Sequence, residues 1–287
     1  MKILAEMADF SRFAKTYSLG KDIIIEQGVS FSGFHGGLME RLEIGDHCYF
    51  GKDVNIACPE LVVGDYVTIH RRTGIFGEKP CVIGHNCWIG QDCILNTHGF
   101  LWIGNNVQIG AANHIWTHAA AGELFEGCLV NYAIPTIIED DVWICGGHST
   151  INPGVTLAKK TMILPHSVVI KDTIPKMMYR GAPAEELVTA YYTSSSSPFL
   201  KKERYKLLDS WIEEFVLKYP EIIVNRYDDI VWVNNTCFDL ISKYYEKTES
   251  LSEVAFIKFL KGNKIRFVPS DNPVVGKELL EKYGRKE

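Results

Sequence analysis

Three side chains capable of acid–base chemistry recur at one spacing along this chain. Glu78, His98 and His118 are twenty residues apart. An imidazole has an ordinary pKa of about 6.5, so it can accept or donate a proton near neutral pH. Such a spacing predicts that the three side chains stack along one edge of a regular structure. His114, in the same NHIWTH segment as His118, is the rival candidate for proton transfer.

A six-residue repeat is the element that would position these side chains. Aliphatic or aromatic residues recur at every sixth position, and glycine often follows them. This period fits neither an α-helix nor a hairpin meander, but it fits a solenoid whose coils have three short sides. Each coil then has about 18 residues, and seven coils can be counted. We expect the apolar residue of each side to point inward and glycine to provide positive φ at the corners.

Four interruptions of this repeat fall at one corner of the coil. The steps from Ile56 to Val63, Ile75 to Ile83 and Leu95 to Ile103 are too long by one or two residues, and the step from Ile115 to Ile138 is too long by many. All four fall at the same corner of the coil, where Glu78, His98 and His118 also lie. A protruding loop at about 117–136 is therefore expected to leave from that edge, and long loops of this kind are often functional.

The repeat resembles the [LIV]-G-x-x-[small]-x pattern of the hexapeptide-repeat superfamily over about residues 21–185. That resemblance implies a mainly β fold, a left-handed parallel β-helix. Residues 138–187 are similar to the last coils of CoA-dependent hexapeptide acetyltransferases that modify sugars and antibiotics. The matching steps are Val142–Cys145, Asn152–Thr156, Lys171–Pro175 and Gly181–Ala184. The usual THP loop motif reads THAAAGE here, and the ICGGHST step is one residue longer than usual.

The resemblance implies an acetyl-CoA-dependent acetyltransferase that works without a metal as a homotrimer. Its acceptor would be a hydroxyl or amine of a sugar, either nucleotide-linked or part of a surface polysaccharide. His118 would be the general base that deprotonates the attacking group, and Glu123 or Glu126 would hold its tautomer. His114, His98 and Glu78 would contact the substrate.

Four further residues are assigned to the cosubstrate by the same resemblance. Backbone amides near Gly146 and Gly147 would contact the pantetheine of acetyl-CoA, which lies beside the last coils in this family. Lys171 or Arg180 would meet its phosphates as a cation.

The remaining histidines and the cysteines are interpreted as structural. His35, His47, His70, His85, His148 and His166 are expected at the surface. Cys48, Cys87 and Cys93 occupy the small inward position of the repeat, where a thiol behaves as a small apolar group.

Composition divides the chain near residue 190. Glycine and histidine are concentrated before it and charged residues after it, and Ser194–Ser197 with Pro198 has the composition of a linker. We therefore expect a lead-in at 1–20, the β-helix domain at 21–190 and a small α/β domain at 199–287. The last domain should contain a helix at 200–218, strands at 221–227 and 229–233, a helix near 251–261 and a strand at 265–269. It would cap or brace the β-helix, or recognise a partner or acceptor.

The charge and hydropathy of the chain argue against nucleic-acid-binding, membrane-spanning and secreted proteins. A net charge of −5 argues against a sequence-independent nucleic-acid binder. No apolar run is long enough for a membrane span, and the first residues do not read as a secretory signal, so a cytoplasmic location is expected.

Two alternatives to an acetyltransferase stay open: a γ-type carbonic anhydrase and a non-catalytic scaffold. Against the former, VIGHNCWIG contains His85 but lacks the second histidine five residues later.

Overall fold

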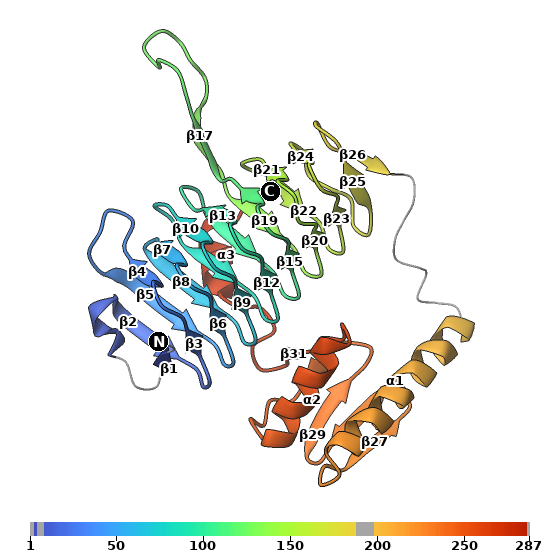
Figure 1. Cartoon of the computed structure of the whole chain (residues 1–287). Helices are drawn as coiled ribbons and strands as arrows, with labels where there is room; N and C mark the ends of the chain where they lie inside the picture. The colour runs from blue at the N-terminus through green and yellow to red at the C-terminus, as the bar shows by residue number, and fades with distance from the viewer. Residues whose placement is uncertain (1–2, 5–8, 188–197, 286–287) are drawn as a thin grey trace. The chain divides into compact units, whose positions relative to one another are not determined.

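The computed structural model describes residues 3–4, 9–187 and 198–285 (Figure 1). The chain divides into two compact units, one formed by residues 1–191 and 274–287 and the other by residues 192–273. The expected linker Ser194–Ser197 lies outside the described residues. No helix in the described ranges is long and apolar enough to cross a membrane.

The first unit is a parallel β-helix with three sheets, one for each side of the coil (Figure 1). Sheet A contains β3 (Ile24–Ile25), β6 (Tyr49–Phe50), β9 (Thr68–Ile69), β12 (Trp88–Ile89), β15 (Gln108–Ile109), β20 (Trp143–Ile144), β23 (Met162–Ile163) and β25 (Met178–Arg180). Antiparallel strands β1 (Ile3–Leu4) and β26 (Glu185–Leu187) close its two ends.

The other two sheets have seven strands each, which confirms the expected seven coils. Sheet B contains β2 (Ala14–Leu19), β5 (Met39–Ile44), β8 (Glu60–Val63), β11 (Cys81–Ile83), β14 (Leu101–Ile103), β19 (Thr136–Ile138) and β22 (Thr156–Leu157). Sheet C contains β4 (Ser30–Ser32), β7 (Asn55–Ala57), β10 (Gly74–Phe76), β13 (Ile94–Asn96), β16 (His114–Ile115), β21 (Thr150–Ile151) and β24 (Val168–Val169).

The inward apolar residues form continuous ladders down each sheet. In sheet C, Ile75 pairs with Leu95, and Leu95 pairs with Ile115. All three side chains are fully buried, because each stacks on its equivalent one coil away. The thiols of Cys48, Cys87 and Cys93 are buried among them, as expected. The expected fold class, a left-handed parallel β-helix with a small α/β unit, is confirmed.

The expectation that the repeat glycines provide positive φ at the corners is wrong. The positive φ at the corners belongs to residues two positions later, such as Tyr66 and Asn86, and not to Gly64 and Gly84. Glycine is needed for another reason, because neighbouring coils approach closely there. A Cβ on Gly84 would lie 2.6 Å from the carbonyl carbon of Gly104 in the next coil. Any larger residue would therefore push two coils apart.

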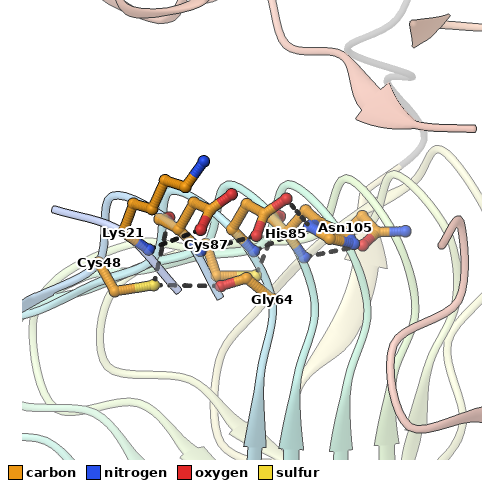
Figure 2. A network of polar contacts seen from close by, with 8 residues as sticks. Lys21, Cys48, Gly64, His85, Cys87 and Asn105 are labelled. Atoms are coloured by element: carbon orange, nitrogen blue, oxygen red, sulfur yellow. Dashed lines mark hydrogen bonds and ion pairs between the residues drawn. The ribbon is translucent and has the colours of Figure 1, made fainter. Parts of the chain in front are cut away.

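The expectation that His85 lies at the surface is also wrong, because the relative exposure of this residue is 2%. It belongs to a ladder in which a corner side chain accepts the backbone N–H of the preceding coil (Figure 2). Aspartate and asparagine provide the acceptor in the other coils, and His85 Nδ1 takes their place. The donor–acceptor pairs are Lys21 to Asp46, Asp46 to Asp65, Asp65 to His85, His85 to Asn105 and Asn105 to Asp140, at 2.7–2.8 Å. His35, His148 and His166 are exposed as expected, while His47 and His70 are half-buried.

The expected loop at 117–136 is a hairpin rather than an irregular segment. Strands β17 (His118–Ala120) and β18 (Asn131–Ala133) pair antiparallel, with His118 opposite Ala133. The hairpin leaves the corner between sheets C and B and extends away from the coils (Figure 1). His118 is its first residue, so the candidate base lies at the root of the hairpin.

Both ends of the β-helix domain extend beyond the expected boundaries. The lead-in at 1–20 contributes β2 to the first coil, where Leu19 pairs with Ile44. It also contributes the short helix η2 (Phe10–Arg12), whose Phe10 covers the end of the apolar core. This end needs covering because the first coil has no neighbour on one side.

The last fourteen residues belong to the first unit and not to the expected domain at 199–287. Helix α3 (Lys277–Tyr283) packs on the outer face of sheet B, where Val275 and Leu279 cluster with Val82 and Phe100. Arg285 forms an ion pair with Asp172 at 2.8 Å. This segment returns to the β-helix because it carries apolar residues that complement the unusually apolar outer side of β8 and β11.

The second unit has a five-stranded sheet with two helices. Its elements are α1 (Pro198–Lys218), β27 (Val224–Tyr227), β28 (Ile230–Val233), β29 (Thr236–Asp239), β30 (Tyr244–Tyr245), α2 (Leu251–Gly262) and β31 (Val268–Pro269). The expected helices and strands are all present. Phe215, Phe238 and Phe256 form its core, with ring centroids about 5 Å apart.

Candidate active site

The residues at the corner between sheets C and B follow equivalent strands of successive coils. Asn96 ends β13 and pairs with Phe76 of β10, while Leu95 pairs with Ile115 of β16. This register places His98 and His118 at the same position of adjacent coils, with Glu78 one coil before them. Parallel coils are about 4.8 Å apart, so side chains at this position can touch.

The rings of His98 and His118 stack, with centroids 4.2 Å apart and an interplanar angle of 26°. Glu78 is exposed and lies 3.7 Å from His35 Nε2, while its negative charge also acts on His98. The structure therefore brings together three of the residues singled out by spacing. His114 lies at the start of β16, and the ring of Trp116 neighbours both His114 and His118, with centroids 6.3 and 6.0 Å away.

Asn96 is the residue that connects the two imidazoles. Its side chain is fully buried below them. The Oδ1 atom of Asn96 lies 2.9 Å from His118 Nδ1, and its Nδ2 atom lies 2.8 Å from His98 Nδ1. Thr117 supports this amide, because its hydroxyl donates to Asn96 Oδ1 at 2.8 Å and accepts the Gly99 N–H at 2.9 Å.

The expectation that a carboxylate, Glu123 or Glu126, holds the tautomer of His118 is therefore wrong. Glu123 and Glu126 lie in the exposed part of the hairpin, and Glu123 accepts the backbone N–H of Phe125 instead. The sequence repeats Thr97-His98 as Thr117-His118 at the twenty-residue spacing, but Trp116 stands at the position equivalent to Asn96. The repeat therefore marks the histidines and gives no signal for Asn96.

The surroundings of the histidine pair disfavour a charge on His98. Partial burial lowers the pKa of His98 below its ordinary value, and a charge on the adjacent His118 lowers it further. The rings of Phe34 and His98 make a T-shaped contact, with centroids 4.8 Å apart. His98 is thus held as a neutral imidazole at neutral pH.

The residues expected to contact the cosubstrate lie on later coils. Gly147 has its N–H occupied, because it donates to the Ala111 carbonyl at 3.1 Å, and its carbonyl accepts the His166 N–H. It is therefore part of the coil's own hydrogen bonding. Gly146 lies beside Gly110 at the same corner. Lys171 and Arg180 are exposed, so their charges are accessible to an anion.

A metal centre is not supported by these arrangements. Among the described residues, no group of three His, Cys, Asp or Glu side chains is placed to hold a metal ion. His85, the histidine of the VIGHNCWIG segment, uses Nδ1 to accept the Asp65 N–H. The γ-type carbonic anhydrase alternative is not favoured.

Comparison with known proteins points to acetyltransferases. No family model matches the chain. It is 42% identical over 137 residues to the galactoside O-acetyltransferase of Escherichia coli K12, covering 40% of this chain and 66% of the relative. Among solved structures, it is similar to a hexapeptide-repeat acetyltransferase from Vibrio cholerae (25% identity, TM-score 0.37, 50% of this chain and 74% of the other). Another is a UDP-N-acetylglucosamine acyltransferase from Campylobacter jejuni (17% identity, TM-score 0.42, 61% and 71%).

The curated relatives are named acetyltransferases, which confirms the predicted resemblance to acetyltransferases. The chain spans between about half and two thirds of the length of the curated relatives it matches.

Proposed function

We propose that this chain is an acetyl-CoA-dependent acetyltransferase that modifies a hydroxyl or amine of a sugar, with His118 as the general base. The observation that carries the proposal is the position of His118. Its Nδ1 is anchored on the buried Asn96, and its ring is half-buried at the root of the hairpin. The other ring edge, with Nε2, has no hydrogen-bond partner among the described residues.

The acetyl group and the sugar acceptor are supported by the relative with 42% identity, which is named a galactoside O-acetyltransferase. In the proposed step, Nε2 of His118 takes the proton of the acceptor as its oxygen or nitrogen attacks the thioester carbonyl. The C–S bond then breaks, and the leaving thiolate receives the proton. No covalent enzyme intermediate is required.

Acetyl-CoA would lie along the last coils, where Lys171 and Arg180 are accessible to its phosphates. The acceptor would be a free, nucleotide-linked or polysaccharide-bound sugar. We also propose a homotrimer and a cytoplasmic location. All eight cysteines are unpaired, which is typical of a reducing compartment.

The experiment that tests the function is release of free thiol from acetyl-CoA, with mass detection of the product. Nucleotide-linked amino sugars, galactosides and plain hexoses would be offered as acceptors. We expect acceptor-dependent release and a product heavier by one acetyl group. Lability of the product to base then separates an ester from an amide. No release with any acceptor, in protein shown separately to bind CoA, would contradict a small-sugar acceptor.

The base is tested by His118→Ala in the same assay. Loss of a general base typically lowers the rate about 10²–10⁴-fold. His114→Ala is measured beside it, because His114 is the rival half-buried histidine of the same segment, and a larger loss there would assign the base to His114 instead. A His118→Ala variant within about threefold of the parent kcat would exclude His118 as the base.

A further inference from the structure

We propose that Asn96 holds His98 and His118 in opposite tautomers, so that one ring is a proton acceptor and its stacked neighbour is a hydrogen-bond donor. Asn96 is then a positioning residue, and His98 donates from Nε2 to the charge that develops on the thioester oxygen. This catalytic role of His98 rests on the function proposed above, whereas the tautomers themselves do not.

The orientation of the Asn96 amide follows from backbone groups whose roles are unambiguous. Its Oδ1 faces the backbone N–H groups of His98 and Thr117 at 3.3 and 3.4 Å, and these groups can only donate. Its Nδ2 faces the Phe76 carbonyl at 3.5 Å, which can only accept. The reversed amide would oppose donor to donor and acceptor to acceptor at all three contacts.

The amide orientation determines the proton on each imidazole. Since Oδ1 only accepts, His118 must carry its proton on Nδ1, which leaves a lone pair on Nε2. Since Nδ2 only donates, His98 must accept at Nδ1 and carry its proton on Nε2. The two stacked rings therefore present opposite chemistry from the same ring position.

The same contacts distinguish the charged forms. Protonated His118 keeps its Nδ1–H bond to Asn96 Oδ1, so it can receive a proton during a reaction without loss of this contact. Protonated His98 would direct a second N–H at the Asn96 amino group, which opposes its ionisation. Burial and the neighbouring His118 act in the same direction, and Glu78 opposes them.

These properties suit the two charges that develop during acyl transfer, a positive charge on the base and a negative charge on the carbonyl oxygen. As the acceptor attacks, its proton moves to His118 Nε2 and negative charge moves onto the carbonyl oxygen. A neutral donor 4.2 Å from the base ring can stabilise that oxygen without competing for the proton. Removing one such donor from an acyl-transfer site typically lowers kcat about 10²–10³-fold.

The tautomers are tested in the full chain by long-range ¹H–¹⁵N correlation of ¹⁵N-histidine-labelled protein, at a pH where both rings are neutral. Resonances are assigned with His98→Gln and His118→Gln. We expect protonated Nδ1 for His118 and protonated Nε2 for His98. The same tautomer in both rings would overturn the proposal, whatever the activity of the protein.

Asn96→Asp tests the positioning role, because a carboxylate accepts but cannot donate. His118 should keep its tautomer, while His98 should move its proton to Nδ1 or become charged. In the acetyl transfer assay, the apparent pKa of kcat/KM should rise by about one unit or more, since a negative charge favours imidazolium. An unchanged His98 tautomer in the folded variant would overturn the proposal.

The catalytic role of His98 is tested by comparing two variants. His98→Ala removes the donor and should lower kcat with little change in KM, whereas His98→Gln restores an N–H donor and should recover part of the loss. Equal activity of both variants and the parent would exclude the donor role. Absence of transfer in the parent with opposite tautomers would instead reject the proposed function and leave the tautomer assignment standing.

Discussion

The rings of His98 and His118 stack at 4.2 Å, although they lie in different coils. At this separation a charge on one ring opposes a charge on the other. The pair therefore cannot be treated as two independent histidines, and its protonation depends on how the coils are aligned.

Stability of the protein should depend on pH through His98. Its pKa is lowered in the folded state, mainly by burial and then by His118. Below about pH 6.5 the unfolded chain binds this proton more readily than the folded chain, so stability falls as pH falls. We expect His98→Gln to lose less stability than the parent between about pH 7.5 and pH 5.5 in urea unfolding. His166→Gln, at an exposed histidine, is the control. Parallel pH curves for parent and His98→Gln would contradict the shift.

Replacing His85 should affect stability according to whether an acceptor remains. His85→Ala leaves the buried Asp65 N–H without its partner, which typically costs about 1–3 kcal/mol. His85→Asn keeps a side-chain acceptor of the kind that Asn105 provides one coil later, so it should cost clearly less. Both are measured by urea unfolding followed by circular dichroism. Equal losses would show that ring packing, and not the hydrogen bond, makes His85 stabilising.

Docking of α3 should be sensitive to substitution at Gly276. This residue has a φ of +59°, and an added Cβ would lie 2.9 Å from both methyl carbons of Val82. We expect Gly276→Ala to destabilise by about 1–3 kcal/mol through strain and overpacking. The control is Gly36→Ala in the same unit, where φ is +84° but no atom lies within 4 Å.

Hydrogen exchange of residues 277–283 would locate the effect. It should become faster in Gly276→Ala and remain at the parent rate in Gly36→Ala. Equal stability losses without faster exchange would mean that the contact with Val82 is accommodated and only the backbone conformation matters.

Thiol reactivity should separate the cysteines by burial. Burial raises the pKa of Cys58 to about 12 and that of Cys93 to about 11, so neither forms the reactive thiolate at neutral pH. Cys128, in the hairpin, is partly exposed. We expect iodoacetamide to modify Cys128 in the folded protein and to modify Cys58 and Cys93 only after denaturation, as mass spectrometry of peptides would show. Rapid modification of Cys58 would indicate that the coils open readily.

The coil architecture and the alignment of His98 with His118 could be predicted from the sequence. In a stack of equivalent coils, linear spacing converts directly into spatial position, because each coil is registered by backbone pairing and by the inward ladder. The spacing of Leu95 and Ile115 is therefore enough to place the histidines that follow them. A separate spacing of apolar residues, with the period of a helix, predicted α1.

Other features depend on contacts that no spacing encodes. Asn96 joins the two imidazoles because its side chain turns inward below them, and His85 is buried because it replaces an aspartate in a ladder of backbone acceptors. The return of α3 to sheet B depends on apolar residues about 200 positions apart. The sequence by itself thus determined the periodic frame and the edge that carries the histidines. Only the tertiary structure decided their hydrogen-bond partners, because side-chain direction and long-range packing are set when the coils and the C-terminal segment assemble.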